Sequence, residues 1–369
     1  MLGATPETAC AISANPHVPN QTIVQQWDRV RHLDETTKDR RMIEALLAAW
    51  LRRAALIITL SVLLTAPAWR DAIAEEYPSR TVSLVVAYPA GGGVDTVGRI
   101  IAQKLTDALG QQVVVVNRPG GGSVIGTRDV ARARPDGYTL LLMVTGAALA
   151  ANPGYDIEKD FEAISLIALV PVVIMSNLSV PAKSLAEVIA LAKREGAKLT
   201  IGTPPSPTLN YFGAEQFKAM TGTDITIVTY KGTGPLTNDL VAGHVMLAFN
   251  TLPPAIGNIQ SGALRAIAVG SPSRVAAIPD VPTLAESGLP DLEIVQYYGL
   301  VAPATTPQPI IERLNTELRK ILTSEDVKKR LIDAGGDPIP STPAEYARNI
   351  QREEKKWQAV IKKLGLVVN

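Results

Sequence analysis

Cysteine and histidine are nearly absent from this chain of 369 residues, which contains one Cys and three His. Disulfide frameworks, zinc sites built from cysteines and redox chemistry of paired thiols are therefore excluded. Charge is scarce as well, since only 19% of the residues are Asp, Glu, Lys or Arg and the formal net charge is +1. A nucleic-acid partner is not expected, because proteins that bind one usually carry a basic surface that neutralises phosphates.

Hydrophobic residues, by contrast, make up 46% of the chain, which is long enough for two domains and can bury a sizeable core. From Tyr77 onward, short β-branched runs alternate with helical patterns, which is typical of an α/β protein built on parallel sheets. Two such βαβ runs of similar size, one before and one after about residue 178, predict two lobes.

Residues 1–74 are expected to form an amino-terminal extension and a secretory signal peptide that the mature protein does not keep. Arg52 and Arg53 precede the apolar run 54–64, and small residues and helix breakers follow it, which is the layout of such a peptide. The run is well short of the roughly 20 residues that a membrane-spanning helix needs. A retained amino-terminal anchor is therefore the less favoured alternative.

Two processing features of this segment follow from its sequence. Signal cleavage is favoured after Ala74, with Ala68 as the alternative, because small residues stand one and three positions before each cut. Residues 1–41 are polar and lack apolar periodicity, so translation is expected to start at Met42. A disordered cytoplasmic tail is the alternative for these residues.

Little in the remaining chain supports catalysis. It has no Cys and a single His, His244, which follows Gly243 in the turn before a predicted strand. A Ser-His-Asp arrangement would have to use this imidazole, and no Gly-x-Ser-x-Gly elbow accompanies it. Because other imidazoles are missing and no acidic motif is clustered, a metal site is not expected either. The sequence therefore predicts no catalytic residue, no metal ligand and no cofactor.

Three predicted helices begin at the carboxyl ends of strands, where open α/β sheets place their ligands. The glycines at 91–93 let the backbone approach a ligand closely, and the helix behind them offers free N–H groups and a positive dipole end. Residues 206–208 and 232–235 precede two further helices, so the three together predict an anion pocket. The alternative for each glycine run is a tight turn without a ligand. A dinucleotide site is disfavoured, because neither glycine-rich turn reads Gly-x-Gly-x-x-Gly.

Asp95 lies in the first turn of the helix after the glycine loop, and two roles are open for it. Its carboxylate can complement the helix dipole and pair with Arg99 four residues on. Alternatively, it can help to close the ligand site.

Seven ordered segments extend along the chain: Tyr-Pro-Ser-Arg at 77–80, Pro-Ala-Gly-Gly-Gly-Val-Asp at 89–95, Asn-Arg-Pro-Gly at 117–120, Pro-Asp-Gly-Tyr-Thr-Leu at 135–140, Tyr-Lys-Gly at 230–232, Ile-Pro-Asp-Val-Pro-Thr at 278–283 and Gly-Leu-Val-Ala-Pro at 299–303. Together they resemble the motifs of the Bug family, the substrate-binding receptors of tripartite tricarboxylate transporters in bacterial periplasms. The resemblance covers essentially all of residues 77–369.

This resemblance implies an α/β fold of the type II periplasmic binding protein class. Its two lobes would each be an α/β sandwich, joined by a hinge that the chain crosses twice, near Asn177 and near Gly299. The first lobe would then comprise residues 77–177 and 300–369, and the second lobe residues 178–299.

The implied function is that of a monomeric, non-enzymatic receptor in the periplasm of a Gram-negative bacterium. Its lobes would close on a small organic carboxylate and deliver it to the membrane permease subunits of a tripartite tricarboxylate transporter. One alternative is a receptor that presents its ligand to a sensor kinase. A less favoured alternative is a two-lobed α/β enzyme, a transferase or isomerase, that uses Asp95 as a base.

By the family pattern, backbone amides and hydroxyls of the loops hold the ligand. The positions implied here as ligand-binding are Tyr88, Ala90, Gly92, Gly93, Asp95, Thr145, Ser206, Thr208, Gly232, Thr233, Gly234, Asn250 and Thr251.

The sequence departs from the family pattern at the loop 203–210. In the family this loop is often rich in Gly and Ser and is followed by a His, whereas here it holds three prolines and no His. Proline has no N–H to donate, so amide contacts there depend on Ser206, Thr208 or their neighbours. Tyr297 stands where Trp is common, and Asn250 where Asp is common. These departures leave the identity of the carboxylate open, including whether the far end of the site binds an amine or a second carboxylate.

Overall fold

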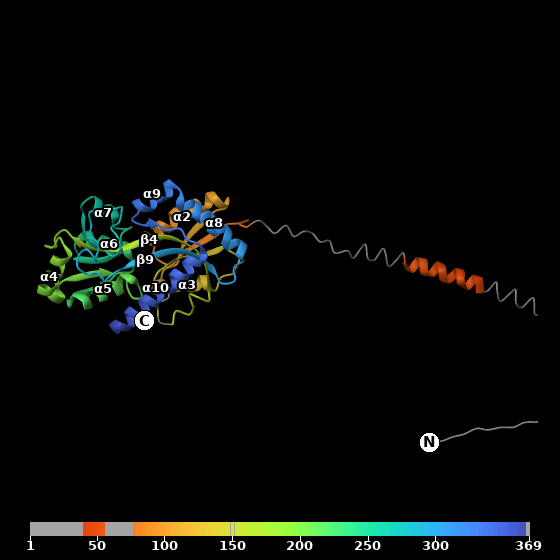
Figure 1. The fold of residues 1–369 in the computed structure, drawn as a ribbon, viewed down its shortest axis with the longest axis horizontal. Coiled ribbons are helices and arrows are strands. Elements are labelled where there is room, and N and C mark those ends of the chain that lie inside the picture. Colours follow the sequence, from red (N-terminus) through yellow and green to blue (C-terminus); the bar gives the residue numbers. More distant parts are fainter. Residues whose placement is uncertain (1–39, 56–76, 148, 151, 367–369) are drawn as a thin grey trace, which may run out of the picture. The chain divides into compact units, whose positions relative to one another are not determined.

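The computed structural model describes residues 40–55, 77–147, 149–150 and 152–366 (Figure 1). The chain divides into two units, residues 1–74 and 75–369. In the first unit, residues 40–55 form a helix whose side chains are almost all exposed. Most of the predicted apolar run 54–64 and both predicted cleavage sites lie outside the described residues. None of the helices in the described ranges combines the length and the apolar composition that a bilayer crossing requires.

The second unit alternates strands and helices, as the sequence predicts. Its strands are β1 (Val82–Val86), β2 (Val113–Asn117), β3 (Thr139–Val144), β4 (Phe161–Asn177), β5 (Thr200–Thr203), β6 (Thr226–Thr229), β7 (Leu247–Thr251), β8 (Leu264–Val269), β9 (Val295–Pro303) and β10 (Asp337–Pro338). Its α-helices are α2 (Gly93–Leu109), α3 (Val124–Ala131), α4 (Leu185–Glu195), α5 (Leu209–Thr221), α6 (Thr233–Ala242), α7 (Ile256–Gln260), α8 (Gln308–Thr323), α9 (Glu325–Asp333) and α10 (Pro343–Leu364).

Two sets of parallel strands are joined by two long antiparallel strands. In the first set β1 pairs with β2 and β3, and in the second set β5 pairs with β6 and β7, all in parallel. Strand β4 pairs with β9 from Phe161 to Pro171, and then with β7 and β8 from Val172 to Asn177. The overall order is β2-β1-β3-β9-β4-β7-β5-β6, with β8 and β10 also paired to β4. The predicted α/β class is confirmed, whereas the predicted lobe boundaries stay a prediction.

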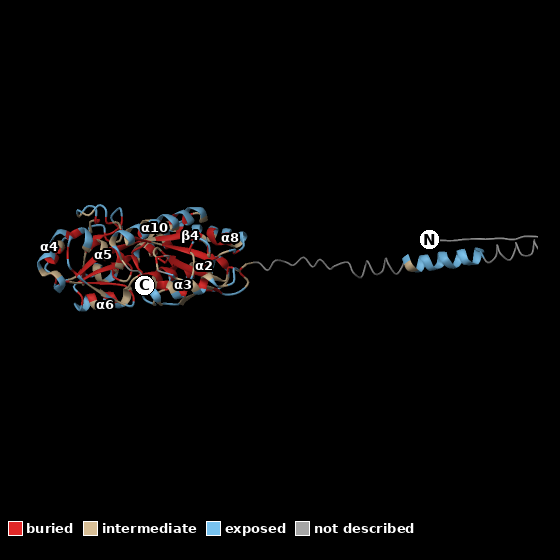
Figure 2. Cartoon of the chain, turned by 90° about the horizontal axis from the view of Figure 1, so that it is seen from below, coloured by how far each residue is buried: buried red, intermediate tan, exposed pale blue. Residues whose placement is uncertain are grey.

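The inner parallel strands β1, β3, β5 and β7 are largely buried because helices cover the sheet on each side, whereas β2 and β6 at the two ends of the strand order are more exposed. In β1, Leu84 packs in a cluster with residues of α2 and α8, and its neighbour Val85 packs in another cluster with Val130 of α3. Figure 2 shows this pattern, with buried strands between helices whose outer faces are exposed. Consecutive side chains of a strand point to opposite faces, so the apolar run at 84–86 requires apolar partners on both sides.

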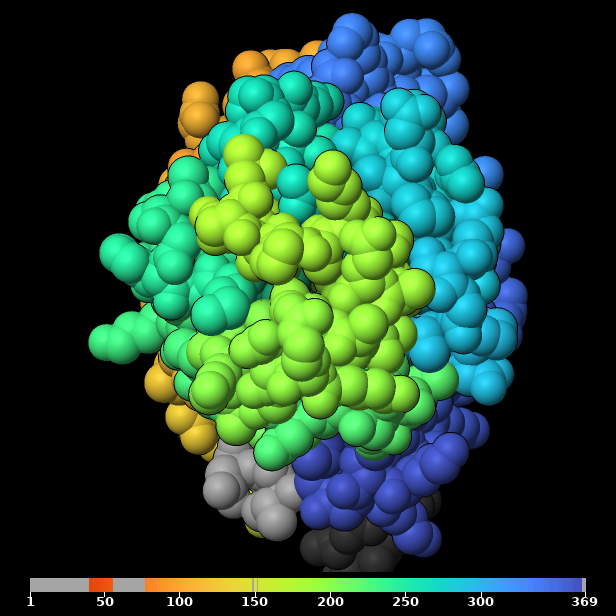
Figure 3. All heavy atoms as spheres, turned by 90° about the vertical axis from the view of Figure 1, so that its left-hand side faces the viewer, coloured from red at the N-terminus to blue at the C-terminus, as the bar shows by residue number. Residues whose placement is uncertain are grey.

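The carboxyl-terminal helix α10 contacts two separate hydrophobic clusters. Near its start, Tyr346 packs with residues of β3 and β9. Eleven residues further on, Trp357 joins the cluster that contains Phe212 and Phe217 of α5, and only 1% of its surface is exposed. Figure 3 shows the blue carboxyl-terminal segment beside the green residues of α5. Helix α10 therefore links the hydrophobic core around β3 and β9 to the core around α5.

Candidate ligand-binding site

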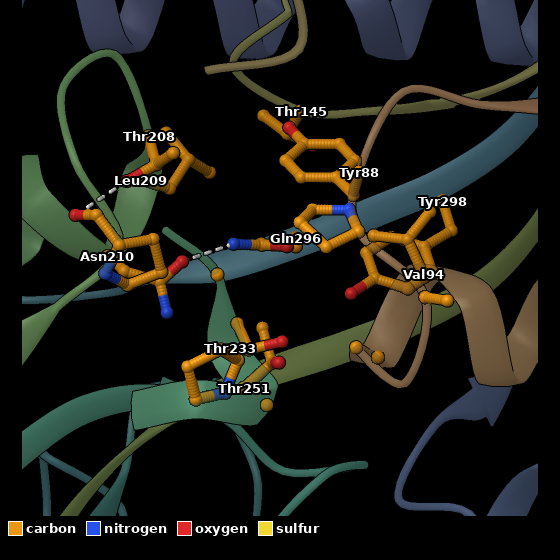
Figure 4. A pocket seen from close by; sticks show the side chains of 18 residues that line it. Tyr88, Val94, Thr145, Thr208, Leu209, Asn210, Thr233, Thr251, Gln296 and Tyr298 are labelled. Atoms are coloured by element: carbon orange, nitrogen blue, oxygen red, sulfur yellow. Dashed lines mark hydrogen bonds between the residues drawn. The ribbon is translucent and has the colours of Figure 1, made fainter. Parts of the chain in front are cut away.

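A cavity lies where the loops after β1, β3, β5 and β6 meet residues of β7 and β9 (Figure 4). It contains about 530 Å³ of space between atoms, part of which is open to solvent. The residues that line it are Tyr88, Pro89, Ala90, Gly92, Gly93, Val94, Thr145, Pro204, Thr208, Leu209, Asn210, Gly232, Thr233, Gly234, Pro235, Thr251, Gln296 and Tyr298.

Three helices begin at this cavity. The first residues of α2, α5 and α6 are Gly93, Leu209 and Thr233, and all three line it. The first N–H groups of a helix have no partner within the helix, and they carry the positive end of its dipole. Side chains cap only one of these helices: the hydroxyl of Thr208 accepts a hydrogen bond from the Tyr211 N–H at the start of α5. The starts of α2 and α6 thus offer N–H groups to an anion.

The glycines at the start of α2 allow two loops to approach each other closely. A Cβ on Gly92 would lie 2.9 Å from Thr233 Oγ1, and a Cβ on Gly93 would lie 3.0 Å from Thr251 Oγ1 and 3.2 Å from the Tyr298 hydroxyl. Any side chain at either position would therefore occupy space in front of these hydroxyl groups. The glycine loop and the starts of the neighbouring elements can meet only because these two residues lack a side chain.

Two hydroxyl groups in the cavity lack a hydrogen-bond partner among the described residues. They are Thr251 Oγ1 and the Tyr298 hydroxyl, whose residues are only 1% and 0% exposed. Burial, and to a smaller extent the neighbouring Tyr88, raises the pKa of Tyr298, so the phenol stays protonated and can donate. The Thr251 hydroxyl is close enough to lower this pKa in part, but the two hydroxyls do not meet in hydrogen-bond geometry. A buried polar group without a partner costs free energy. These two groups are therefore suited to a ligand that brings its own acceptor atoms.

The cavity lining contains no charged side chain. Burial raises the pKa of Tyr88 to about 12, so this tyrosine is neutral as well. Within the described ranges, no three or more His, Cys, Asp or Glu side chains are grouped so that they could hold a metal ion. An anion in the cavity would be stabilised by N–H groups, hydroxyls and helix dipoles instead of a basic side chain or a metal.

The structure brings ten of the sequence-predicted site residues together around this cavity: Tyr88, Ala90, Gly92, Gly93, Thr145, Thr208, Gly232, Thr233, Gly234 and Thr251. The other three, Asp95, Ser206 and Asn250, are not among its lining residues. Asn250 lies behind the lining, where its Nδ2 donates to Thr237 Oγ1 at 2.9 Å and to Thr233 O at 3.2 Å. Ser206 Oγ is buried without a partner among the described residues.

Asp95 holds the glycine loop in place through hydrogen bonds made outside the cavity. Its carboxylate accepts hydrogen bonds from the Gly91 N–H at 3.0 Å, from Arg99 Nε at 2.9 Å and from Asn117 Nδ2 at 3.0 Å. Burial raises the pKa of this carboxyl group, but the hydrogen bonds from Arg99, Gly91 and Asn117 outweigh that effect, so the net pKa is lowered. Asp95 is thus an ionised residue that positions the loop from outside the cavity.

We expect Asp95→Asn to lower the stability of the free protein at neutral pH by about 1–3 kcal/mol, because hydrogen bonds to a buried charge are lost. Since the folded-state pKa of Asp95 is lowered, its stabilising effect is present above the ordinary carboxyl pKa of about 3.9 and is lost as the pH falls through the folded value. Urea denaturation at neutral and acidic pH should therefore show a difference between wild type and variant that shrinks in acid.

The control for this substitution is Asp129→Asn, which removes an exposed ion pair with Arg118 and should change stability little. A large loss of ligand affinity with unchanged stability in Asp95→Asn would contradict the positioning role and would indicate direct contact with the ligand.

Three polar lining residues are absent from the sequence-based prediction: Gln296 and Tyr298 of β9, and Asn210 of α5. Gln296 lies in β9, where it is a polar residue on an otherwise apolar strand, and Asn210 lies in the first turn of α5. Both are buried, and Gln296 Nε2 donates a hydrogen bond to Asn210 Oδ1 at 2.6 Å. A polar side chain within an apolar strand was the signal that could have identified Gln296.

A family model and the sequences of known proteins point to the same family of transport receptors. A family model for the tripartite tricarboxylate transporter family receptor matches residues 97–366. Protein BugT of Bordetella pertussis is 34% identical over 298 residues, which cover 79% of this chain and 91% of that protein.

Solved structures are similar over the same region. The structure of the periplasmic binding protein BugD shares 32% identity with a TM-score of 0.75, covering 78% of this chain and 99% of that one. The R. palustris protein Rpa4515, solved with adipate, shares 33% identity with a TM-score of 0.75 and covers 79% of this chain and 99% of its own. These similarities confirm the two-lobed fold class predicted above.

Proposed function

Because this chain belongs to the family of tripartite tricarboxylate transporter receptors, we propose that it captures a small organic carboxylate in the periplasm by closing its two lobes. The observation that carries this proposal is the pair of buried, unpartnered hydroxyls of Thr251 and Tyr298 beside the start of α2. Hydroxyl and N–H donors of this kind match the oxygens of a carboxylate. The R. palustris neighbour was solved with adipate, a small organic carboxylate, which supports a carboxylate as the ligand of this chain.

The proposal also covers export of the protein, its maturation and delivery of its ligand. Residues 1–74 would direct export and be removed, and the mature receptor would act as a monomer. Its lobes would be residues 77–177 with 300–369, and residues 178–299. The closed receptor would deliver its ligand to the membrane permease subunits of the transporter.

An enzyme that uses Asp95 as a general base is disfavoured by the state of that residue. A general base at neutral pH works best with a pKa near the working pH, which for a carboxylate requires a raised value. The pKa of Asp95 is lowered instead, and its oxygens are engaged with Gly91, Arg99 and Asn117. The family and the structural neighbours are binding receptors, which fits a receptor without a catalytic residue.

A thermal-shift panel of mono-, di- and tricarboxylates and aromatic acids tests the proposal. We expect at least one acid to stabilise the protein, by about 2.7 kcal/mol at a concentration 100 times its dissociation constant. If sugars or nucleotides raise the melting temperature while no compound with a carboxylate does, the carboxylate proposal fails. Conversion of the bound compound on prolonged incubation would favour the enzyme alternative.

A further inference from the structure

The amide of Asn210 is held in one orientation by a backbone carbonyl. Its Nδ2 donates a hydrogen bond to the carbonyl oxygen of Phe249 at 3.2 Å. A carbonyl oxygen only accepts hydrogen bonds, so Asn210 must direct its nitrogen there and its Oδ1 away. Asn210 is only 1% exposed, so water cannot take the place of the Phe249 carbonyl and allow the opposite amide orientation.

The orientation of Asn210 in turn determines that of Gln296. Asn210 Oδ1 lies 2.6 Å from Gln296 Nε2, and an oxygen that accepts must meet a nitrogen that donates. Figure 4 shows the Gln296 side chain extended across the cavity toward Asn210. Gln296 Oε1 is left without a partner among the described residues, although Gln296 lines the cavity and is only 6% exposed.

Gln296 therefore offers the cavity an acceptor, Oε1, and the one N–H that does not bond to Asn210. A hydroxyl or a carboxamide on the ligand can satisfy both, since each of these groups donates and accepts. A carboxylate can only accept, so it would leave Oε1 unsatisfied and would face it with like charge. An ammonium can only donate, so it would leave the N–H unsatisfied.

The neutral lining of the cavity adds to this argument. A first carboxylate would use the uncapped starts of α2 and α6 and the hydroxyls near Gly93. The third helix start, that of α5, is capped by Thr208, and no basic side chain lines the cavity to balance a second negative charge. No acidic side chain lines it to balance an ammonium. Burying an unpaired charge is far more costly than burying a neutral group with its hydrogen bonds made.

We propose that the ligand of this receptor has one carboxylate and, at its other end, an uncharged hydroxyl or carboxamide that hydrogen-bonds to Gln296. This inference rests on the proposed function and narrows its substrate class. It assigns Gln296 as a residue that determines specificity and Asn210 as the residue that positions it.

Matched ligands test the proposal on the full, unmodified protein. Succinate, glutarate and adipate are each compared by calorimetry with their monoamide, and with the hydroxy acid and the amino acid of the same chain length. We expect the best-bound length to show a monoamide or hydroxy acid at least about tenfold tighter than the matched dicarboxylate and amino acid, the difference that one unsatisfied buried group produces.

The outcomes separate this inference from the proposed function. A dicarboxylate or amino acid that binds as tightly as its neutral counterpart overturns the inference but leaves a carboxylate receptor. Failure of every acid to bind overturns both.

Gln296→Glu provides a second test, with Gln260→Glu at the exposed end of helix α7 as the matched control. A carboxylate at 296 cannot donate to Asn210 and places a negative charge in the cavity. We expect the preference to shift toward the matched amino acid by about tenfold or more, while the control keeps the wild-type order. A purely structural role of Gln296 would lower the melting temperature of the free protein without changing this order, and that result would overturn the assignment.

Discussion

Replacing Tyr298 by Phe should weaken carboxylate binding by about 10- to 100-fold and leave the free protein as stable as the wild type or more stable. The hydroxyl is buried beside Gly93 without a hydrogen-bond partner, so its removal costs the free protein no hydrogen bond. When a carboxylate is bound, the same hydroxyl donates to a charged acceptor, a bond worth about 1.5–3 kcal/mol. The same reasoning applies to Thr251→Val, and the double variant should lose about 100-fold or more.

Tyr77→Phe is the matched control for this prediction. The Tyr77 hydroxyl donates to the carbonyl oxygen of Gly137 at 2.7 Å, so it is already satisfied in the free protein. Its removal should lower stability by about 1 kcal/mol and leave ligand affinity unchanged. Urea denaturation and calorimetry on the variants measure both quantities. Equal stability losses for Tyr298→Phe and Tyr77→Phe, with unchanged affinity in both, would contradict the ligand contact.

The fold was predictable because local patterns and tertiary packing agree. Helix α2 begins at Gly93, the last residue of the glycine run that predicts its start, and Gly110 ends it in the left-handed conformation, with a φ of 68°. The alternation of buried parallel strands with amphipathic helices is visible in the sequence because such strands need apolar residues on both faces. The pairing of β4 with β9 over its first part and with β7 over its last part was not predictable, because it depends on partners far away in the sequence.

The site was predictable where it consists of backbone and of helix starts. The sequence predicts the helix starts at which Gly92, Gly93 and Thr233 lie. The structure brings these three residues to one cavity. Asp95 lies in the first turn of α2 and Asn250 lies next to Thr251 in β7, but neither lines the cavity, and both bond to other parts of the scaffold. Sequence position identifies the loop to which a residue belongs. It does not identify the direction of its side chain.

The role of Gln296 could not be predicted from local sequence. Its strand reads as part of the core, and its role depends on Asn210, which is 86 residues away in the sequence. Only the folded chain brings the two amides together. The glycines and helix starts proposed to bind the carboxylate were therefore visible in local sequence, while the contact proposed to select among carboxylates is long-range.

The largest loss of affinity is expected from Gly93→Ala, which should weaken carboxylate binding by about 100-fold or more. The added methyl group would lie 3.0 Å from Thr251 Oγ1 and 3.2 Å from the Tyr298 hydroxyl, in the space that the ligand oxygens need to reach both donors. Two hydrogen bonds to a charged group would be lost together, each worth about 1.5–3 kcal/mol. Because Gly93 is the first residue of α2 and its φ is not positive, alanine fits the backbone. Its Cβ would nevertheless crowd the buried side chains of Thr251 and Tyr298, so we expect a loss of stability of about 1–3 kcal/mol beside the loss of affinity.

Gly257→Ala separates this steric effect from the general effect of an added methyl group. Gly257 lies in helix α7, and a Cβ there would meet nothing within 4 Å, so its substitution should leave affinity unchanged. Calorimetry with the best-bound acid and denaturation of both variants make the comparison. Wild-type affinity in Gly93→Ala would mean that the ligand does not approach the start of α2. In that case the buried hydroxyls of Thr251 and Tyr298 would need another explanation, because the methyl group stands directly in front of them.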